Sequence, residues 1–407
     1  MSPSSSDRRV FLKKVGATVA AAYGGVPAHA LDGQSQAADT VLPGKNPRLV
    51  VHTAAPAVLE TPLDLLAQDR ITPIDALFVR NVQHSAALLT IKPASLAGWK
   101  IELAGLVDRP QTINARLLED LEQVAVEMVL QCSGNGRSLF SAAAKIKGTA
   151  WGRGGMGNVR FSGVPLQSVL DHFGIQPKKE ARYLSAEGVD DPVAGEQDFE
   201  HSLPLADALK KSILALRING EPIPTVHGGP VRLVTGGYYG TMHVKWISRL
   251  RFDAEESNHT SQVPHYRTPL VAIAPGEPFE ATLANSEPNW RMKIKSVVLA
   301  PLPGAQLTAG EVSASGVAFN DGEAAIETVL VSSDAGRTWQ RAEIDAPDSP
   351  YAWYRWQAKL NLPPGRQQIW ARAIDKLGRT QPLDGTIHWN PNGYTWNGVD
   401  KIDVTVA

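Results

Sequence analysis

Cys132 is the only cysteine among 407 residues, and it stands where an apolar stretch ends in the segment EMVLQCSGNGRSLF, residues 127–140. Gly134 and Gly136 follow it, and glycines let backbone N–H groups approach a ligand closely. The cation of Arg137 favours the thiolate form of a nearby sulfur, and a thiolate is a good ligand for a soft or strongly Lewis-acidic metal. An inert cysteine buried in the core is the commoner case and remains the alternative, although such cysteines usually lie inside apolar strands.

A second candidate lies in the segment ALFVRNVQHSA, where the apolar run 77–79 leads into Arg80 and Asn81, with His84 close behind. Arginine is suited to a planar, bidentate grip on an oxyanion. Taken alone, however, the pattern fits a surface arginine after an edge strand better than it fits a binding site.

A glycine-rich segment, WGRGGMGNVRFSG at residues 151–163, carries Arg153, Asn158 and Arg160. Such a segment can pack its backbone against a flat or phosphate-bearing ligand. It is not a dinucleotide-binding fingerprint, because no strand–G-x-G-x-x-G–helix context surrounds it and no acidic residue follows at the expected spacing. A glycine-rich surface loop is an equally good interpretation.

Residues 219–250 bring His227, Arg232, His243 and Lys245 together among turns and glycines. Arg232 and Lys245 are suited to hold a phosphate, and either histidine could hydrogen-bond a heterocycle. A lone histidine is usually a satisfied polar residue, but four such residues in one stretch are harder to dismiss. With one thiolate donor, several glycine loops and scattered cations, this part of the chain suits a large anionic cofactor held by many weak contacts and one metal–sulfur bond.

Other functional classes are disfavoured by what the sequence lacks. There is no Cys-x-x-Cys-His for c-type haem and no cysteine set for an iron–sulfur cluster. No zinc constellation and no Gly-x-Ser-x-Gly elbow is present. The formal net charge of -1, with 43% hydrophobic and 20% charged residues, argues against nucleic-acid binding, and no apolar run is long enough to span a bilayer.

The N-terminus has the layout of an export signal, predicted over residues 1–30. Arg8 and Arg9 begin an Arg-Arg-x-Phe-Leu-Lys core, a weakly apolar stretch follows, and Ala28 and Ala30 form an A-x-A cleavage site. This order is typical of a twin-arginine signal peptide, and the alternative is a frayed basic tail. Twin-arginine export moves folded proteins, commonly because a cofactor is inserted in the cytoplasm. The predicted location is therefore the periplasm.

The rest of the chain divides by composition. Residues 31–48 are polar and small, which predicts a linker or N-terminal arm. Residues 49–260 mix short strand-like runs with few helix signals, such as the apolar residues at helical spacing between Pro165 and Gly174, and predict an α+β domain with mixed sheets. From 265 to 407, β-type alternation is separated by turn signals, which predicts an all-β sandwich of immunoglobulin type.

Several motifs carry a family resemblance: FVRN, LQCSGNGRS, GNVRFSGVPLQSVL, SLPLADAL, NGEPIPTVHGGPVRLV, YYGTMHVKWI, SSDAGRTW and WNPNGYTWN. Together they resemble the sulfite oxidase family of molybdenum enzymes, over nearly all of the chain from about residue 50. The layout is most similar to that of bacterial periplasmic sulfite dehydrogenases. The resemblance implies a molybdopterin-binding domain followed by an immunoglobulin-like dimerisation domain, and hence a homodimer.

The resemblance also implies roles for the residues already singled out. Molybdenum would be bound by the dithiolene of molybdopterin and by Cys132, and Arg80 would hold the oxyanion of sulfite. The reaction implied is oxidation of sulfite to sulfate by oxygen-atom transfer, with electrons passed to a separate cytochrome c. The candidates for binding the cofactor are Asn81, His84, Arg137, Asn158, His227, Arg232, His243 and Lys245.

Two positions depart from the family pattern. Phe199 stands where the family has a tyrosine near the metal, so His201 is a candidate to replace its hydrogen-bonding role. Tyr354 stands where the family has a second substrate-binding arginine, and Arg355 follows it by one residue. One residue along a strand means the opposite face, so Arg355 can serve only if a bulge intervenes. The catalytic candidates are therefore Arg80, Cys132, His201 and Arg355.

These departures leave two other functions open. One is a related molybdenum enzyme acting on another sulfur substrate, as a sulfane-sulfur dehydrogenase subunit or a sulfoxide reductase. The other is a non-catalytic exported binding or assembly protein, against which the intact Cys132 argues.

Overall fold

The structure is a computed structural model that describes residues 37–81, 88–190 and 197–407. The predicted signal peptide and the first part of the predicted linker lie outside these ranges, so both stay predictions. None of the helices in the described ranges has the length and apolar character needed to cross a membrane.

The start of the described chain packs against its neighbours. Helix α2 (Ala38–Val41) buries Ala38, and Lys45 is buried in the turns that follow. A small antiparallel sheet comes next, with helix α3 (Leu63–Gln68) between its second and third strands. Its strands are β1 (Val50–Thr53), β2 (Val58–Glu60) and β3 (Val79–Arg80). Because β3 ends at Arg80 and pairs with β2, this sheet positions Arg80.

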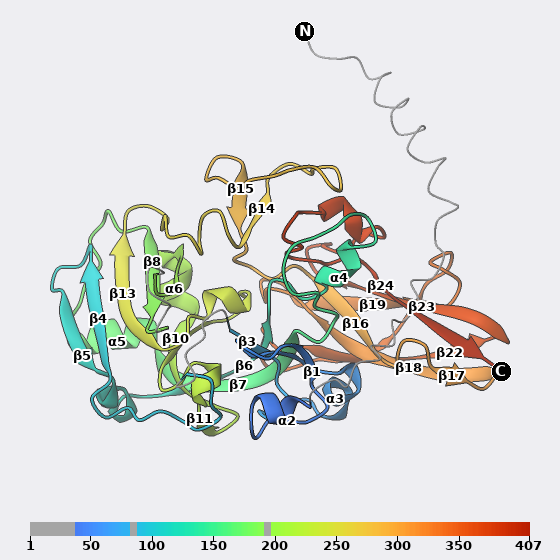
Figure 1. Ribbon diagram of the computed structural model, residues 1–407, viewed down its shortest axis with the longest axis horizontal. Coiled ribbons are helices and arrows are strands. Elements are labelled where there is room, and N and C mark those ends of the chain that lie inside the picture. The colour runs from blue at the N-terminus through green and yellow to red at the C-terminus, as the bar shows by residue number, and fades with distance from the viewer. Residues whose placement is uncertain (1–36, 82–87, 191–196) are drawn as a thin grey trace, which may run out of the picture. The chain divides into compact units, whose positions relative to one another are not determined.

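The first domain is built on two five-stranded sheets (Figure 1). One is antiparallel and consists of β6 (Val124–Gln131), β7 (Met156–Pro165), β10 (Ser212–Ile218), β11 (Glu221–Pro222) and β12 (Arg232–Thr235). The other consists of β4 (Lys100–Gly105), β5 (Gln111–Asn114), β8 (Tyr183–Gly188), β9 (Glu200–Pro204) and β13 (Ile247–Asp253). It is mixed, because β4 and β13 run parallel and the other neighbours antiparallel.

Helices are few and short in this domain. Helix α5 (Leu166–Phe173) starts after Pro165, buries Leu166, Val169 and Leu170 at helical spacing, and ends at Gly174. That glycine has φ 62°, a left-handed conformation that favours glycine. The remaining helices are α4 (Arg137–Phe140) and α6 (Leu205–Lys211), with 3-10 turns at Ala115–Asp120, Thr225–His227 and Gly240–Met242. The prediction of an α+β domain with mixed sheets is confirmed.

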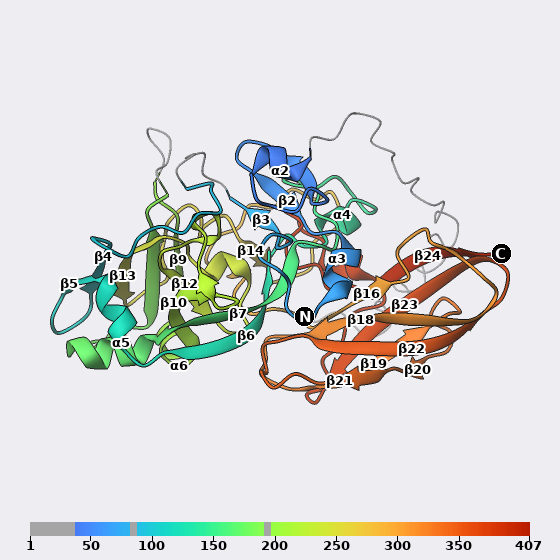
Figure 2. The ribbon, with the colours of Figure 1, turned by 90° about the horizontal axis from the view of Figure 1, so that it is seen from below.

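The second domain is a sandwich of two sheets (Figure 2). The four-stranded sheet consists of β16 (Lys295–Ala300), β18 (Gly310–Phe319), β22 (Tyr354–Leu362) and β21 (Glu343–Asp345). The five-stranded sheet consists of β17 (Gln306–Leu307), β24 (Asp400–Val406), β23 (Gly365–Asp375), β19 (Ile326–Ser332) and β20 (Gln340–Arg341). Alternate residues of β22 are buried, as expected for a strand with one face on the core. The predicted all-β sandwich is confirmed.

Between the two domains lie a short pair of strands and a shared apolar cluster. The pair is β14 (Arg267–Pro269) and β15 (Ser286–Pro288), and a 3-10 turn, Gly385–His388, precedes the last strand. Leu66 and Tyr239 of the first domain pack in one buried cluster with Phe319 and Trp353 of the second. This continuous apolar contact fixes the two domains to one another.

Candidate active site

One cavity gathers most of the residues that the sequence singled out. Its empty space, including the solvent in the open mouth, is about 740 Å³. Six parts of the chain form it: the end of β3, the end of β6, Asp190 and Phe199 before β9, the 3-10 turn Thr225–His227, the stretch from β12 to β13, and Tyr266 just before β14. The predicted residues on its wall are Arg80, Asn81, Cys132, His227, Arg232, His243 and Lys245.

Cys132 follows β6 directly, and its side chain is 8% exposed at the cavity wall. Its backbone N–H donates to the carbonyl of Gly155 at 2.9 Å, and its Sγ accepts from the N–H of Gly134 at 3.4 Å. A Cβ on Gly134 would meet the guanidinium of Arg137 at 2.7 Å. The tight glycine loop therefore leaves the sulfur at the cavity wall, with the N–H of Gly134 as a backbone donor to it.

Two cations lie at the cavity wall, Arg232, which is buried, and Lys245, which is half-buried. Arg232 donates from Nε to the carbonyl of His243 at 3.0 Å and from Nη1 to that of His227 at 2.9 Å. Lys245 donates to the carbonyls of Arg80 at 3.1 Å and Val226 at 2.9 Å. Burial lowers the pKa of Arg232 to about 9, and it lowers that of Lys245 well below its usual value.

The charge on this wall is poorly compensated by the protein. Asp190 is the acidic side chain of the cavity lining, and burial raises its pKa to about 7. A buried cation without a paired anion is costly. An anionic ligand such as a phosphate would supply the missing charge next to Arg232 and Lys245.

The cavity histidines are held neutral. Burial lowers the pKa of His243 to about 3, and that of His227 falls well below its usual value. The Nε2 of His243 lies 2.9 Å from the carbonyl oxygen of Thr235, and because a carbonyl only accepts, Nε2 carries the proton. The Nδ1 of His243 is thus a free acceptor, suited to an N–H of a bound heterocycle.

Several buried polar atoms of the cavity lack a partner among the described residues. They are Asn81 Nδ2, Thr241 Oγ1 and His243 Nδ1. Buried polar atoms normally find a hydrogen-bond partner, and here they include a donor, a hydroxyl and an acceptor. A large heterocyclic, anionic cofactor would satisfy them, so the cavity fits the kind of group that the sequence predicted.

Arg137 and Asn158 lie close to the cavity but do not line it. Arg137 donates from Nε to the carbonyl of Asn392 at 2.7 Å and from Nη1 to that of Thr149 at 2.9 Å. Asn158 is fully buried on β7 and donates to Oε1 of Glu127 at 2.8 Å. Arg137 thus braces the loop after Cys132 and Asn158 ties β7 to β6, and neither side chain lines the cavity.

Arg355 is not brought to the cavity. The β18–β22 ladder is regular at this point, with Tyr354 opposite Ala318 and Arg355 opposite Val317, so the bulge that Arg355 would need is absent from this ladder. Its Nη2 donates to the carbonyl of Ala67 at 2.9 Å, at the end of α3. Tyr354 packs into the core of the sandwich. The geometry therefore does not support the catalytic role predicted for Arg355. His84 lies outside the described residues.

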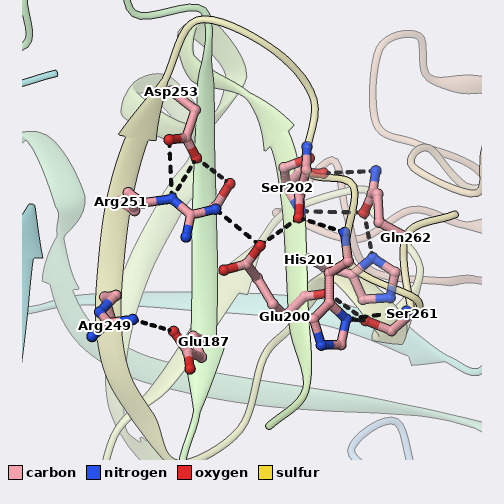
Figure 3. A network of polar contacts seen from close by, with 12 residues as sticks. Glu187, Glu200, His201, Ser202, Arg249, Arg251, Asp253, Ser261 and Gln262 are labelled. Carbon is pink, nitrogen blue, oxygen red and sulfur yellow. Dashed lines mark hydrogen bonds and ion pairs between the residues drawn. The ribbon is translucent and has the colours of Figure 1, made fainter. Parts of the chain in front are cut away.

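His201 lies one layer behind the cavity wall. Its ring packs against Phe199, with the centroids 4.8 Å apart, and it hydrogen-bonds through Nδ1 to Oε1 of Gln262 (Figure 3). The amide oxygen of Gln262 only accepts, so Nδ1 carries the proton of the ring. Burial lowers the pKa of His201 to about 3. An imidazole that stays neutral and faces Phe199 cannot deliver a proton to the cavity, so this geometry does not support the predicted role.

The strand that carries His201 is fixed by an ionic network on its other face (Figure 3). Glu200 accepts from Arg251 at 3.1 Å and from the hydroxyl of Ser257. Arg251 also donates to Asp253 at 3.0 Å. These contacts hold β9 against β8 and β13, and so place Phe199 at the cavity.

Sequence reasoning missed several residues of the site. Asp190, Thr241 and Tyr266 line the cavity, and Lys45 lies behind it. Thr241 stands inside the glycine-rich stretch 219–250, so the pattern of that stretch could have indicated it as a site residue. Asp190, Tyr266 and Lys45 stand in segments without periodicity, and only long-range contacts bring them here.

Comparisons with known proteins agree with the geometry. Residues 89–261 match the family model described as the oxidoreductase molybdopterin binding domain, and residues 286–407 match the Mo-co oxidoreductase dimerisation domain. Human mitochondrial sulfite oxidase is 30% identical over 377 residues, which cover 90% of this chain and 67% of that protein. The chain belongs to the sulfite oxidase family. The sulfite oxidase of Arabidopsis thaliana is 26% identical over 86% of this chain and 92% of its own length.

The chain is also similar to a solved bacterial structure. The sulfane dehydrogenase SoxCD from Paracoccus pantotrophus superposes with a TM-score of 0.72 and 25% identity, covering 94% of this chain and 95% of that chain. As a member of the sulfite oxidase family, the chain has a molybdopterin-binding oxidoreductase domain and a dimerisation domain. Molybdenum–molybdopterin is therefore the group that the cavity is built to hold, and the unpartnered atoms and the cations of the wall fit it.

Proposed function

We propose that this protein is a periplasmic molybdenum-dependent sulfite dehydrogenase that oxidises sulfite to sulfate and passes electrons to a separate cytochrome c. The observation that carries the proposal is the sharing of one cavity by Cys132 and Arg80 with Arg232 and Lys245. A metal-binding sulfur, a cation for the substrate and cations for a phosphate are thus combined in one site.

Each residue has a separate task in this proposal. Cys132 binds molybdenum as a thiolate, and Arg232 and Lys245 neutralise the phosphate of the pterin. Asn81 and His243 hydrogen-bond the heterocycle through the atoms that the protein leaves unpartnered. When bound, the cofactor supplies the oxygen-atom transfer that converts sulfite to sulfate.

Arg80 would hold the sulfur oxyanion. One of its Nη atoms donates to the carbonyl of Asn81, which fixes the guanidinium at the end of β3. The positive charge of Arg80 at the cavity wall favours an anionic substrate. It also stabilises negative charge that develops on the oxygens of the substrate. The dimerisation domain supports a homodimer as the working form.

A second candidate is oxidation of a sulfane-sulfur substrate. It is favoured by the wall beside Arg80, which carries Phe199 and Tyr266, while Arg355 lies outside the cavity and Arg137 is engaged with carbonyls. With Arg232 and Lys245 assigned to the cofactor phosphate, Arg80 is left for the substrate, and one arginine beside aromatic rings suits a sulfur anion that carries a further group. A sulfoxide reductase is less favoured, because the sandwich domain accompanies the first domain here.

The test combines molybdenum analysis of the purified protein with sulfite-dependent reduction of cytochrome c. We expect one molybdenum per chain, rapid reduction of cytochrome c with sulfite, little reduction with thiosulfate, and no oxidation of a reduced electron donor when methionine sulfoxide is added. Turnover of thiosulfate in preference to sulfite would move the assignment to the sulfane candidate. A purified protein without molybdenum would favour a non-catalytic binding or assembly protein.

The location is tested separately. Replacing Arg8 and Arg9 by lysine should leave the protein in the cytoplasm, since twin-arginine export depends on the pair. Unchanged appearance in the periplasmic fraction would contradict this part of the proposal.

A further inference from the structure

Tyr266 lies on the cavity wall in a backbone conformation that tyrosine rarely adopts. Its φ is 51°, in the left-handed region, where side chains with a Cβ are strained. The surroundings hold it there. Its carbonyl accepts from the N–H of Asn289 at 2.8 Å, and the next residue, Arg267, is buried and donates to Ser286 Oγ at 2.8 Å and pairs with Glu256. A strained residue fixed by several contacts at a cavity points to a function for its side chain.

Among the described side chains of its aromatic cluster, Tyr266 is the one that lines the cavity with a free hydrogen-bond donor. It stacks on Tyr394 with ring centroids 5.2 Å apart, and lies edge-on to Phe199 at 6.1 Å and to His201 at 5.3 Å. Phe199 has no polar atom, and His201 donates its only ring proton to Gln262. Tyr394 is buried and is not on the cavity wall, whereas Tyr266 is.

Tyr394 reaches this cluster from the second domain. The N–H of the following residue, Thr395, donates to the carbonyl of Ser133 at 2.7 Å, directly beside Cys132. The guanidinium of Arg137 lies 5.3 Å from the centroid of the Tyr394 ring. The ring of Tyr394 therefore contacts both Arg137, in the loop after Cys132, and Tyr266.

We propose that Tyr266 is a further catalytic residue, whose hydroxyl donates a hydrogen bond to an oxygen of the sulfur oxyanion held by Arg80. Tyr394 is the positioning residue that keeps the Tyr266 ring in place by stacking. The inference rests on the proposed function for the identity of the oxyanion. In this proposal the phenol at the substrate comes from Tyr266, in the segment between the two domains. Phe199 supplies only an apolar ring.

The experiment compares molybdenum-loaded wild-type enzyme with Y266F, Y394F and Y394L. Y266F removes only the hydroxyl, so we expect kcat/KM for sulfite to fall about 100-fold, with unchanged molybdenum content and thermal stability. The affinity for the product sulfate, measured by calorimetry, should fall about tenfold. Y394F keeps the stacked ring and should retain activity within about threefold, whereas Y394L should move in the direction of Y266F.

Two further variants control the comparison. Y183F removes a hydroxyl on β8 outside the cavity lining and should leave kcat/KM unchanged. F199Y combined with Y266F places a phenol on the neighbouring ring and should recover part of the lost rate. Wild-type kcat/KM in Y266F would overturn the assignment of Tyr266, and so would loss of molybdenum from Y266F. If the wild-type enzyme oxidised no sulfite, the proposed function would fail by itself, and equal sulfate affinities of wild type and Y266F would still overturn the role of the hydroxyl.

Discussion

The Nζ of Lys45 lies 3.3 Å from the Nε2 of His227 and joins the start of the described chain to the wall of the cavity. Lys45 also donates to the carbonyls of Leu77, at 2.6 Å, and Ile74. While Lys45 is protonated its ammonium can only donate, so in that state His227 offers it the lone pair of Nε2 and carries its own ring proton on Nδ1. The segment 37–48, which the sequence presents as an arm, thus contacts a histidine of the cavity wall.

Lys45→Met should change how stability depends on pH. Burial lowers the pKa of Lys45 from 10.5 to about 7, so between these values the unfolded chain holds a proton that the folded protein has lost. The contribution of Lys45 to the free energy of unfolding therefore rises with pH in this window, and its unfavourable effect is complete below pH 7. The stability of the variant minus that of wild type should therefore fall from about pH 7 to about pH 10 in denaturant titrations.

The matched control for that prediction is Lys92→Met, at an exposed lysine. Its difference from wild type should stay flat over the same range. Parallel stability curves for Lys45→Met and wild type would show that Lys45 keeps an ordinary pKa in the folded protein.

Cys132→Ser should abolish sulfite oxidation while the protein stays folded. A neutral hydroxyl is a poor substitute for a thiolate as a metal ligand, and the two side chains have nearly the same size. X-ray absorption of the loaded protein should show one sulfur fewer around molybdenum. Ser133→Ala, next in sequence, should keep the full sulfur count. Unchanged sulfur coordination in Cys132→Ser would exclude Cys132 as the ligand.

Arg80→Gln and Arg355→Gln should separate a substrate-binding arginine from a structural one. Removing a charge-assisted contact to the oxyanion should lower kcat/KM for sulfite about 10- to 100-fold in Arg80→Gln. Arg355→Gln loses only the bond to the carbonyl of Ala67 and should lose about 1 kcal/mol of stability with unchanged kinetics. Steady-state kinetics and thermal unfolding of both variants provide the check. An impaired Arg355→Gln enzyme of normal stability would contradict the placement of Arg355.

Lys245→Met should have opposite effects in the empty and the loaded protein. Without cofactor, Lys245 is a half-buried cation whose pKa desolvation has lowered, so its replacement should leave the melting temperature equal or higher. With cofactor, the variant lacks a cation for the phosphate and should retain less molybdenum after purification. Lys211→Met removes an ammonium 3.4 Å from Asp207, away from the cavity, and should not change molybdenum content. Full molybdenum content in Lys245→Met would refute the phosphate role.

Local sequence patterns were enough to predict much of the fold. The helix from Leu166 to Phe173 was predictable because proline, apolar spacing and a closing glycine all act within about ten residues. The sandwich was predictable because strand alternation repeats between turn signals. The site was only partly predictable. Arg80 and Cys132 stand at strand ends, a position visible in the sequence, but nothing local indicates that Lys45 or Tyr266 reaches the same cavity.

By itself the sequence determined the class of the two domains, the single sulfur and the supply of cations, since these depend on composition and on spacing along the chain. Tertiary structure decided which of these residues lie close together and which protonation state they have. The register of β22 turned Arg355 toward Ala67, and burial made His201 a neutral imidazole behind Phe199. Contacts from the second domain and from the segment between the domains put Tyr394 and Tyr266 beside the cavity. Register, desolvation and long-range packing arise from residues far apart in sequence, and no local pattern encodes them.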